Sequence, residues 1–214
     1  MRQGVLISLE GVEGSGKSTQ LDLLADHLRG MGRRVLKLRE PGGTALGERI
    51  RALLLDPDGG RISAPAELLL YLGSRSQLVE EIVRPALETR LIILCDRYLD
   101  ATVAYQGYGR GLDVGLIERI NDFVVGDALP DLTFLLDLEA STGLERISAR
   151  SRDRLEAEDL AFHERVRKGY LELASRNPER IKLIPADRGI LEVAAEVRGH
   201  ATAILAAIAT SRTG

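Results

Sequence analysis

The most chemically informative segment of the chain is Gly-Val-Glu-Gly-Ser-Gly-Lys-Ser at residues 11–18, hereafter the phosphate loop. Its glycines let the backbone turn closely enough to aim N–H groups at phosphate oxygens. The Lys17 ammonium would reach the outer phosphates, and the Ser18 hydroxyl would hold Mg²⁺. We therefore predict a nucleoside triphosphate site with bound Mg²⁺. Its predicted residues are Gly11, Glu13, Gly14, Ser15, Gly16, Lys17, Ser18 and Thr19.

A second chemical motif is Asp96-Arg97, which directly follows the apolar run 91–95. An aspartate at a strand end that faces a phosphate loop suits an outer-shell contact to Mg²⁺. The planar guanidinium of Arg97 offers two parallel donors to a phosphate. The alternative is a salt bridge that only ties down the end of the strand.

A third motif, Arg-Glu-Pro-Gly-Gly-Thr at 39–44, holds a cation and an anion beside a rigid turn, because proline fixes φ and glycine permits sharp bends. Arg51 lies one helix further on. Without the neighbouring motifs, this segment would equally be an ordinary loop with a solvated pair of charges.

Four of the five tyrosines fall between residues 71 and 108 in a chain that has no tryptophan. Aromatic faces stack on bases, so this half of the chain is a candidate nucleobase site, although tyrosines also pack at half-buried surfaces. Tyr71 and Arg75 are four residues apart and share one face of a predicted helix. Gln106 could hydrogen-bond a base or sugar. It lies in segment 105–111, which we expect to be too glycine-rich to continue a helix.

Basic residues gather again at 146–154, followed by acidic residues to 159. Most charge runs are solvated helix faces. The functional alternative is a lid, about residues 148–160, whose arginines close over transferring phosphates and exclude water.

The elements that must position these motifs alternate along the chain. Runs typical of buried strands lie at 5–10, 34–39, 91–95, 132–138 and 181–185. Helical patterns lie at 17–30, 45–55, 65–88, 99–105, 113–126, 140–150, 159–175 and 189–209. This order predicts an α/β fold: a five-stranded parallel sheet with helices on both faces. Ligands in such sheets lie beyond the carboxyl ends of the strands, where the motifs following the first three strands would converge.

The bulk properties bound the class of protein. The 214 residues fit a single domain, 1–214, and the formal charge of −3 indicates neither a nucleic-acid nor a membrane partner. The one cysteine, Cys95, lies in an apolar run and has no intramolecular disulfide partner. We expect a cytoplasmic protein, because no apolar stretch is long enough to span a bilayer.

The phosphate loop is compatible with three classes of nucleotide enzyme. A guanine-nucleotide switch would carry an Asn-Lys-x-Asp motif, which is absent, and the string Asp56–Gly59 follows a predicted helix rather than a strand. A nucleoside kinase needs a carboxylate base, for which Glu10, Glu13 and Glu40 are available. A nucleoside monophosphate kinase needs several arginines to hold phosphate charges, which this chain supplies best. A non-enzymatic ATP-dependent switch is a further alternative.

The combined motifs resemble those of bacterial thymidylate kinases, in order and at similar spacing over nearly the whole chain. They are the phosphate loop, the turn 39–44, Asp96-Arg97-Tyr98, Ala104–Gly107, Pro130–Thr133 with Leu135-Leu136-Asp137, and Asp153–Glu156. The resemblance implies a P-loop kinase fold and transfer of the γ-phosphoryl of ATP to dTMP, giving dTDP for dTTP biosynthesis. It also implies a homodimer.

The resemblance implies roles for individual residues. Lys17 would hold the ATP phosphates, and Ser18 with Asp96 would hold Mg²⁺. Acceptor contacts are implied for Glu13 at the 3′-hydroxyl, Arg39 and Arg97 at the phosphate, and Tyr71, Arg75, Thr102 and Gln106 at the base or nucleoside. Because the phosphate loop lacks an arginine, the resemblance assigns the catalytic arginine to the lid. Arg154 is the first candidate, followed by Arg150 and Arg152.

Overall fold

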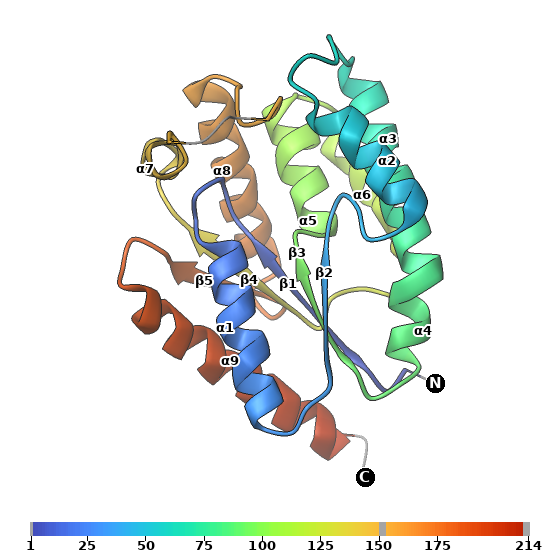
Figure 1. Ribbon diagram of the computed structural model, residues 1–214, viewed down its shortest axis with the longest axis vertical. Coiled ribbons are helices and arrows are strands. Elements are labelled where there is room, and N and C mark those ends of the chain that lie inside the picture. Colours follow the sequence, from blue (N-terminus) through green and yellow to red (C-terminus); the bar gives the residue numbers. More distant parts are fainter. Residues whose placement is uncertain (1, 150–152, 212–214) are drawn as a thin grey trace.

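The computed structural model describes residues 2–149 and 153–211. Five parallel strands form one sheet in the order β2-β3-β1-β4-β5 (Figure 1). They are β1 Val5–Glu10, β2 Val35–Arg39, β3 Ile92–Asp96, β4 Leu132–Asp137 and β5 Ile181–Pro185. The predicted α/β class and parallel sheet are confirmed, because all four neighbouring strand pairs are parallel. Strands that alternate with helices favour this arrangement, since a helical crossover carries the chain back to begin a parallel strand.

The α-helices are close to the predicted ranges. They are α1 Lys17–Gly30, α2 Ala45–Leu55, α3 Ala64–Leu78, α4 Arg84–Leu87, α5 Leu99–Thr102, α6 Val114–Val125, α7 Ala140–Arg146, α8 Leu160–Arg176 and α9 Ile190–Ser211. Among the described residues, α7 ends four residues before the predicted helix 140–150 does; residue 150 lies outside them. No helix in the described ranges has the length and apolar character needed to cross a membrane.

Two predicted helices are interrupted by π-helical segments. The predicted helix 65–88 passes from α3 through a π segment, η1 Val79–Val83, into α4. Pro85 provides the reason, since proline has no N–H and its ring crowds the carbonyl one turn earlier. A wider turn accommodates both effects and keeps the helical run continuous.

The expectation that the glycines would end the helix at 105–111 is wrong. After α5 the chain continues as a π segment, η2 Val103–Gly109. A Cβ built on Gly109 would lie 2.7 Å from the ring of Phe162 in α8. Close packing against α8 therefore stabilises a helical conformation that glycine disfavours in isolation.

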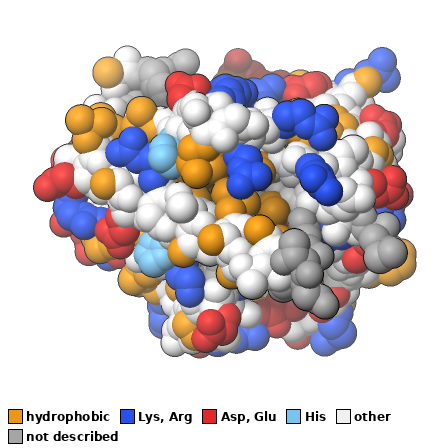
Figure 2. Space-filling view, turned by 90° about the horizontal axis from the view of Figure 1, so that it is seen from below, with side chains coloured by type: hydrophobic (Ala, Val, Ile, Leu, Met, Phe, Trp, Pro, Cys, Tyr) orange, Lys and Arg blue, Asp and Glu red, His pale blue; other side chains and the backbone are white. Residues whose placement is uncertain are grey.

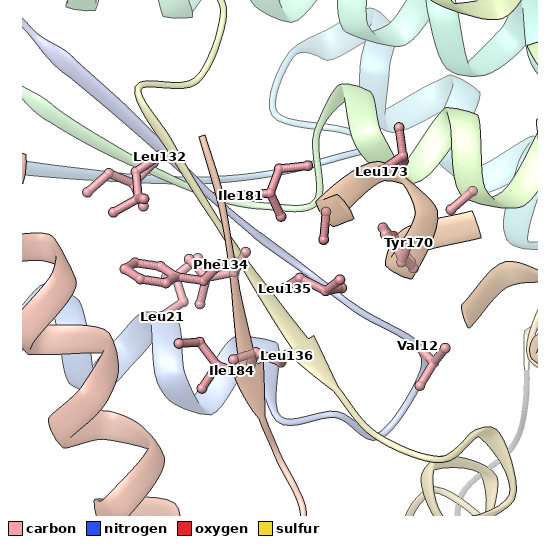
Figure 3. Packing of buried hydrophobic residues seen from close by; sticks show 14 of the residues in the cluster. Val12, Leu21, Leu132, Phe134, Leu135, Leu136, Tyr170, Leu173, Ile181 and Ile184 are labelled. Atoms are coloured by element: carbon pink, nitrogen blue, oxygen red, sulfur yellow. The ribbon is translucent and has the colours of Figure 1, made fainter. Parts of the chain in front are cut away.

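The helices cover both faces of the sheet. Helices α1 and α9 pack together over one face, and α3, α4, α6 and α8 lie on the other side (Figure 1). Figure 3 shows this alternation in β4: Phe134 lies toward Leu21 and Ile184, whereas Leu135 lies toward Tyr170. Both faces are apolar because a parallel sheet is buried on both sides.

The edge of the sheet at the amino ends of its strands is far from the predicted motifs. Figure 2 views the molecule from this side, where hydrophobic side chains gather near the centre with basic side chains among them. A cavity of about 550 Å³ here is lined by apolar residues of β1, β3 and α9 and by Arg2, Arg33 and Arg90.

Candidate functional site

A cavity of about 540 Å³ lies beyond the carboxyl ends of β1, β2 and β3, where the sheet rule predicts a ligand site. It brings together most of the predicted site residues from separate parts of the chain. These are Glu13, Gly14, Gly16, Lys17, Ser18, Thr19, Arg39, Tyr71, Asp96, Arg97, Thr102 and Gln106. The predicted residues Gly11, Ser15, Arg75 and Arg154 do not line it.

The phosphate loop depends on glycine for its shape. Gly11, Gly14 and Gly16 all have positive φ, at 141°, 69° and 93°. Gly14 also approaches Gly143 of α7 so closely that a side chain on either would overlap the other segment's backbone. No side chain caps α1, whose N-cap residue is Gly16, so its first N–H groups are available to an anion.

Lys17 folds back along this loop. Its Nζ donates to the carbonyl oxygens of Gly11, at 3.0 Å, and Val12, at 2.8 Å, and lies 3.4 Å from Ser15 Oγ. Gly11 and Ser15 thus contact the lysine even though they do not line the cavity. Burial, together with the nearby charge of Arg97, lowers the pKa of Lys17 to about 8.

The predicted metal residues meet directly. Ser18 Oγ donates to Asp96 Oδ2 at 2.7 Å, joining the start of α1 to the end of β3. Hard oxygen donors beside a phosphate site suit Mg²⁺, which takes one or two protein oxygens and completes its shell with phosphate and water. In residues 2–149 and 153–211, no group of three or more His, Cys, Asp or Glu side chains forms a metal cage.

Glu13 stands at the centre of a buried polar network. Its Oε1 accepts from Arg97 Nη2 at 2.8 Å, and the Tyr105 hydroxyl lies within 2.7 Å of both carboxylate oxygens. Burial alone would raise the pKa of Glu13, but Arg97, His163 and Lys17 lower it below its usual range. Glu13 is therefore an anion that accepts hydrogen bonds rather than a base that takes a proton.

Arg97 is held by three elements at once. It has the positive φ of 67°, an uncommon conformation for a residue with a side chain, directly after β3. Its Nη1 donates to the Gly11 carbonyl at 3.0 Å and to the Tyr170 hydroxyl at 3.2 Å. The strained backbone and these bonds fix the guanidinium beside the phosphate loop.

The rest of the cavity is lined by the other motifs. Arg39 and Tyr71 come from β2 and α3, and Thr102 and Gln106 come from the α5–η2 run. Arg39 is half exposed and pairs with Glu48 at 2.9 Å, so its guanidinium remains accessible to a ligand. Burial raises the pKa of Tyr71, which keeps its ring neutral.

Arg75 does not reach the cavity in this structure. Its side chain is 1% exposed and all five of its N–H groups have protein acceptors. These acceptors are Glu40 Oε2, Thr102 Oγ1, Asn121 Oδ1 and the Tyr98 carbonyl. The contact with a base implied by the resemblance is not formed here. Arg75 instead positions Thr102, which does line the cavity.

Arg154 also lies elsewhere. Its Nη2 donates to Glu67 Oε2 at 2.6 Å and its Nε to the Leu54 carbonyl at 2.8 Å, so it is held against α2 and α3. The alternative of a solvated helix face is wrong for Arg154, because this residue lies in a turn and its side chain is 13% exposed. Arg150 and Arg152 lie outside the described residues.

Three site residues were missed by the sequence analysis: Glu67, His163 and Tyr170. Glu67 precedes Tyr71 by one helical turn, so the spacing that links Tyr71 to Arg75 could have been extended backwards. His163 and Tyr170 are seven residues apart on one face of α8.

Glu10, which the sequence offered only as the carboxylate base of a nucleoside kinase, accepts a hydrogen bond from the Tyr170 hydroxyl at 2.8 Å. Burial and the nearby Asp100 raise the pKa of Glu10 to about 8.

The fold and the cavity together define a class of protein. A phosphate loop with Lys17 shares one cavity with Arg39 and Arg97, which can hold a second phosphate, and with an aromatic side chain. This arrangement is that of a P-loop phosphotransferase acting on a phosphorylated acceptor.

Comparison with known proteins specifies the family. Residues 9–197 match the family described as Thymidylate kinase. The chain is 50% identical over 196 residues to the thymidylate kinase of Syntrophotalea carbinolica, covering 87% of this chain and 90% of the relative. It is 51% identical over 197 residues to that of Gloeobacter violaceus, covering 91% and 92%. The chain belongs to the thymidylate kinase family.

A solved structure agrees with this assignment. The crystal structure of thymidylate kinase from Ehrlichia chaffeensis has a TM-score of 0.74 and 36% identity, and the match covers 91% of this chain and 96% of that one. The chain is accordingly an enzyme that transfers the γ-phosphoryl group of ATP to dTMP, giving dTDP and ADP.

Proposed function

We propose the following division of this reaction among the residues of the cavity. The N–H groups of the phosphate loop and Lys17 bind the ATP phosphates and stabilise charge on the transferred group. The observation that carries this proposal is the cavity itself, which opens on the uncapped start of α1 and on Arg97. Donor and acceptor phosphates can therefore meet in line between Lys17 and Arg97.

The acceptor end follows from the same cavity. Arg39 and Arg97 bind the dTMP phosphate, which attacks as an oxygen that is already anionic. Tyr71 stacks on thymine, and Thr102 and Gln106 bind the nucleoside. The Glu13 carboxylate accepts from the sugar 3′-hydroxyl. A contact between Arg75 and the base stays a prediction. To form it, Arg75 must replace one of its present hydrogen bonds with a bond to the base.

Ser18 and Asp96 would hold Mg²⁺, Ser18 directly and Asp96 in the outer shell. Their 2.7 Å contact brings two hard oxygens together beside the phosphate loop. When bound, Mg²⁺ supplies positive charge to the phosphate oxygens. Lys17 and Arg97 supply the remaining cationic charge from the protein.

Arg154, with Arg150 as a second candidate, completes the cationic environment when the lid closes. In the present structure Arg154 binds Glu67, so closure must exchange that carboxylate for the transferring phosphoryl group. Closure of the lid would then exclude water and bring Arg154 to the phosphoryl group in the same movement.

The active form is a homodimer. Large apolar side chains are exposed on three helices that pack side by side, α2, α3 and α6, and such groups are typical of interfaces. They are Leu46, Leu53, Leu69, Leu116 and Phe123. Phe123 is 87% exposed and shares one face of α6 with Leu116, seven residues earlier.

We further propose the cytoplasm as the place of action, because ATP and nucleoside monophosphates are available there. We expect neither a nucleic acid nor a membrane to be a partner, given the near balance of 29 basic and 32 acidic residues.

The test is acceptor-dependent release of ADP from Mg·ATP with dTMP, dUMP, UMP, dCMP, AMP and thymidine. Strong preference for dTMP is expected, since the phosphate, base and sugar contacts act together. Turnover with thymidine but not dTMP would make the chain a nucleoside kinase. ATP binding without acceptor-stimulated turnover would instead favour a nucleotide-dependent switch. Lys17→Ala serves as the inactive control.

A further inference from the structure

One buried polar side chain next to Glu13 has no role in the scheme above. His163 is the fourth residue of α8 and is 1% exposed. Its Nδ1 lies 3.5 Å from Glu13 Oε2, and neither ring nitrogen has a hydrogen-bond partner among the described residues. Buried polar groups without partners are rare and costly, so this position requires an explanation.

The hydrogen bonds of Glu13 leave room for one more donor. Oε1 accepts from Arg97, and the Tyr105 hydroxyl lies near both oxygens but has a single proton to donate. Oε2 therefore keeps unused acceptor capacity on the side of His163. The 3.5 Å separation is slightly longer than a hydrogen bond, and a small rotation of the carboxylate would close it.

The surroundings fix the orientation of the imidazole. The ring of Phe162 meets it edge to face, with centroids 5.4 Å apart and planes at 88°. Asp159 caps the start of α8 by accepting from the Phe162 amide at 2.7 Å. His163 does not line the cavity, whereas Glu13, which its imidazole faces, does.

We propose that His163 is a positioning residue that donates from Nδ1 to Glu13 Oε2 and holds the carboxylate toward the acceptor's 3′-hydroxyl. The enzyme would thereby select deoxynucleoside monophosphates that retain this hydroxyl. This inference rests on the proposed contact between Glu13 and the sugar.

The protons balance without any transfer. Glu13 is ionised and accepts one hydrogen bond from the imidazole and one from the sugar hydroxyl. The attacking phosphate oxygen is already anionic, so neither Glu13 nor His163 has to remove a proton during the reaction. His163 acts only by limiting where the carboxylate lies, as a second layer of hydrogen bonding commonly does.

The first test compares kcat/KM for dTMP with kcat/KM for 3′-deoxy-dTMP in the full-length enzyme. His163→Phe keeps the aromatic volume but removes both nitrogens. His163→Asn places an amide N–H at the same number of bonds from Cα as Nδ1. Arg167 lies on the same helix as His163, and Arg167→Gln is the matched control. This variant breaks the ion pairs with Asp137 at the end of β4 and with Glu139, and Arg167 does not contact Glu13.

We expect His163→Phe to reduce the preference for dTMP over the 3′-deoxy acceptor about tenfold, the effect of one hydrogen bond to a charged group. His163→Asn should restore most of the preference. Arg167→Gln should change both acceptors to the same extent. Equal losses for both acceptors in His163→Phe, or no loss at all, would overturn the proposal and leave His163 as a core-filling residue.

A spectroscopic test separates the contact between His163 and Glu13 from the contact between Glu13 and the sugar. Imidazole ¹⁵N NMR in the presence of dTMP should find the proton of His163 on Nδ1, with a shift that changes in Glu13→Gln. A ring protonated only on Nε2 would refute the pairing with Glu13. NMR could instead show the pairing of His163 with Glu13 while the wild-type enzyme uses dTMP and 3′-deoxy-dTMP equally well. That combination would refute the contact between Glu13 and the sugar, and with it the selection that we assign to His163.

Discussion

The guanidinium of Arg154 is bonded to the carboxylate of Glu67 at 2.6 Å, and Glu67 has no exposed surface. Glu67 also accepts from Gln106 at 2.9 Å and pairs with Arg110 at 3.1 Å. One buried anion therefore contacts both Arg154 and Gln106, which lines the cavity. With the roles proposed for these two residues, lid closure and nucleoside binding would share this carboxylate and would be energetically coupled.

The first prediction concerns Arg154. Arg154→Ala should lower kcat about a hundredfold with little change in either KM, because the guanidinium reaches the phosphoryl group only in the closed state. Steady-state kinetics with both substrates varied provides the measurement. Arg176→Ala is the control, because its ion pair with Glu118 lies outside the lid and does not involve Glu67, so kcat should stay close to that of the wild type. A rise in KM alone for Arg154→Ala would make Arg154 a binding residue.

The second prediction uses the lowered pKa of Lys17, about 8. As the pH rises through this value the free enzyme loses the ammonium charge, so kcat/KM for ATP should fall above about pH 8. Bound phosphates favour the charged form, and kcat should therefore persist to higher pH. Lys17→Ala should lose about a thousandfold in kcat.

The matched variant is Lys17→Arg, which stays charged over this pH range. Its kcat/KM profile should be flat near pH 8, even though its rate is lower. If the fall persisted in Lys17→Arg, it would belong to another group, and Glu10 would be the first candidate because its pKa is also about 8.

The third prediction concerns stability. Burial and Asp100 raise the pKa of Glu10 from 4.5 to about 8, so the folded state retains a proton that the unfolded state releases. The contribution of Glu10 is full below about pH 4.5 and should decline as the pH rises to 8, at most by about 1.4 kcal/mol per pH unit. Urea denaturation at several pH values should find that the free energy of unfolding of the wild type falls relative to that of Glu10→Gln over this range, because glutamine does not titrate. A constant difference would contradict the assignment.

The fourth prediction concerns the support of the phosphate loop. Gly143→Ala in α7 should cost about 1–3 kcal/mol and raise KM for ATP, because the added methyl group would overlap the Glu13 carbonyl and displace the loop. Gly199→Ala is the matched control. Apart from the adjacent backbone of α9, no atom of the described residues lies within 4 Å of a Cβ placed at Gly199, so alanine should raise stability by up to about 1 kcal/mol. Similar stabilities and similar KM values for ATP in the two variants would exclude the close contact between Gly143 and the phosphate loop.

The fifth prediction concerns the dimer. Phe123→Asp places a charge in the centre of the proposed interface, which should convert the protein to a monomer in light scattering coupled to gel filtration. Leu191→Asp is the control, because Leu191 is 71% exposed on α9, away from α2, α3 and α6. A wild-type protein that runs as a monomer, or a Phe123→Asp protein that remains a dimer, would refute this interface.

Local patterns in the sequence were sufficient for the frame of the fold and for part of the site. The ranges of β1, β5, α1 and α2 agree with the predicted ones residue for residue. The meeting of Ser18 and Asp96 could also be predicted, because Ser18 lies beyond the end of β1, Asp96 ends β3, and parallel strands end at one edge of the sheet. Such features depend on periodicity, turn chemistry and strand direction, all of which are encoded in short segments.

Tertiary structure decided what those segments could not encode. Arg75 lies inside the protein because Glu40 and Asn121, 35 and 46 residues away in sequence, satisfy its charge and its donors. Arg154 contacts Glu67 and does not lie over the phosphate loop. The arginine-rich sequence around it is compatible with either position, so composition could not decide between them. The helix continues through Gly109 because Phe162 packs on it. In each case the partner is distant in sequence, and only packing decides which of several chemically suitable partners a side chain meets.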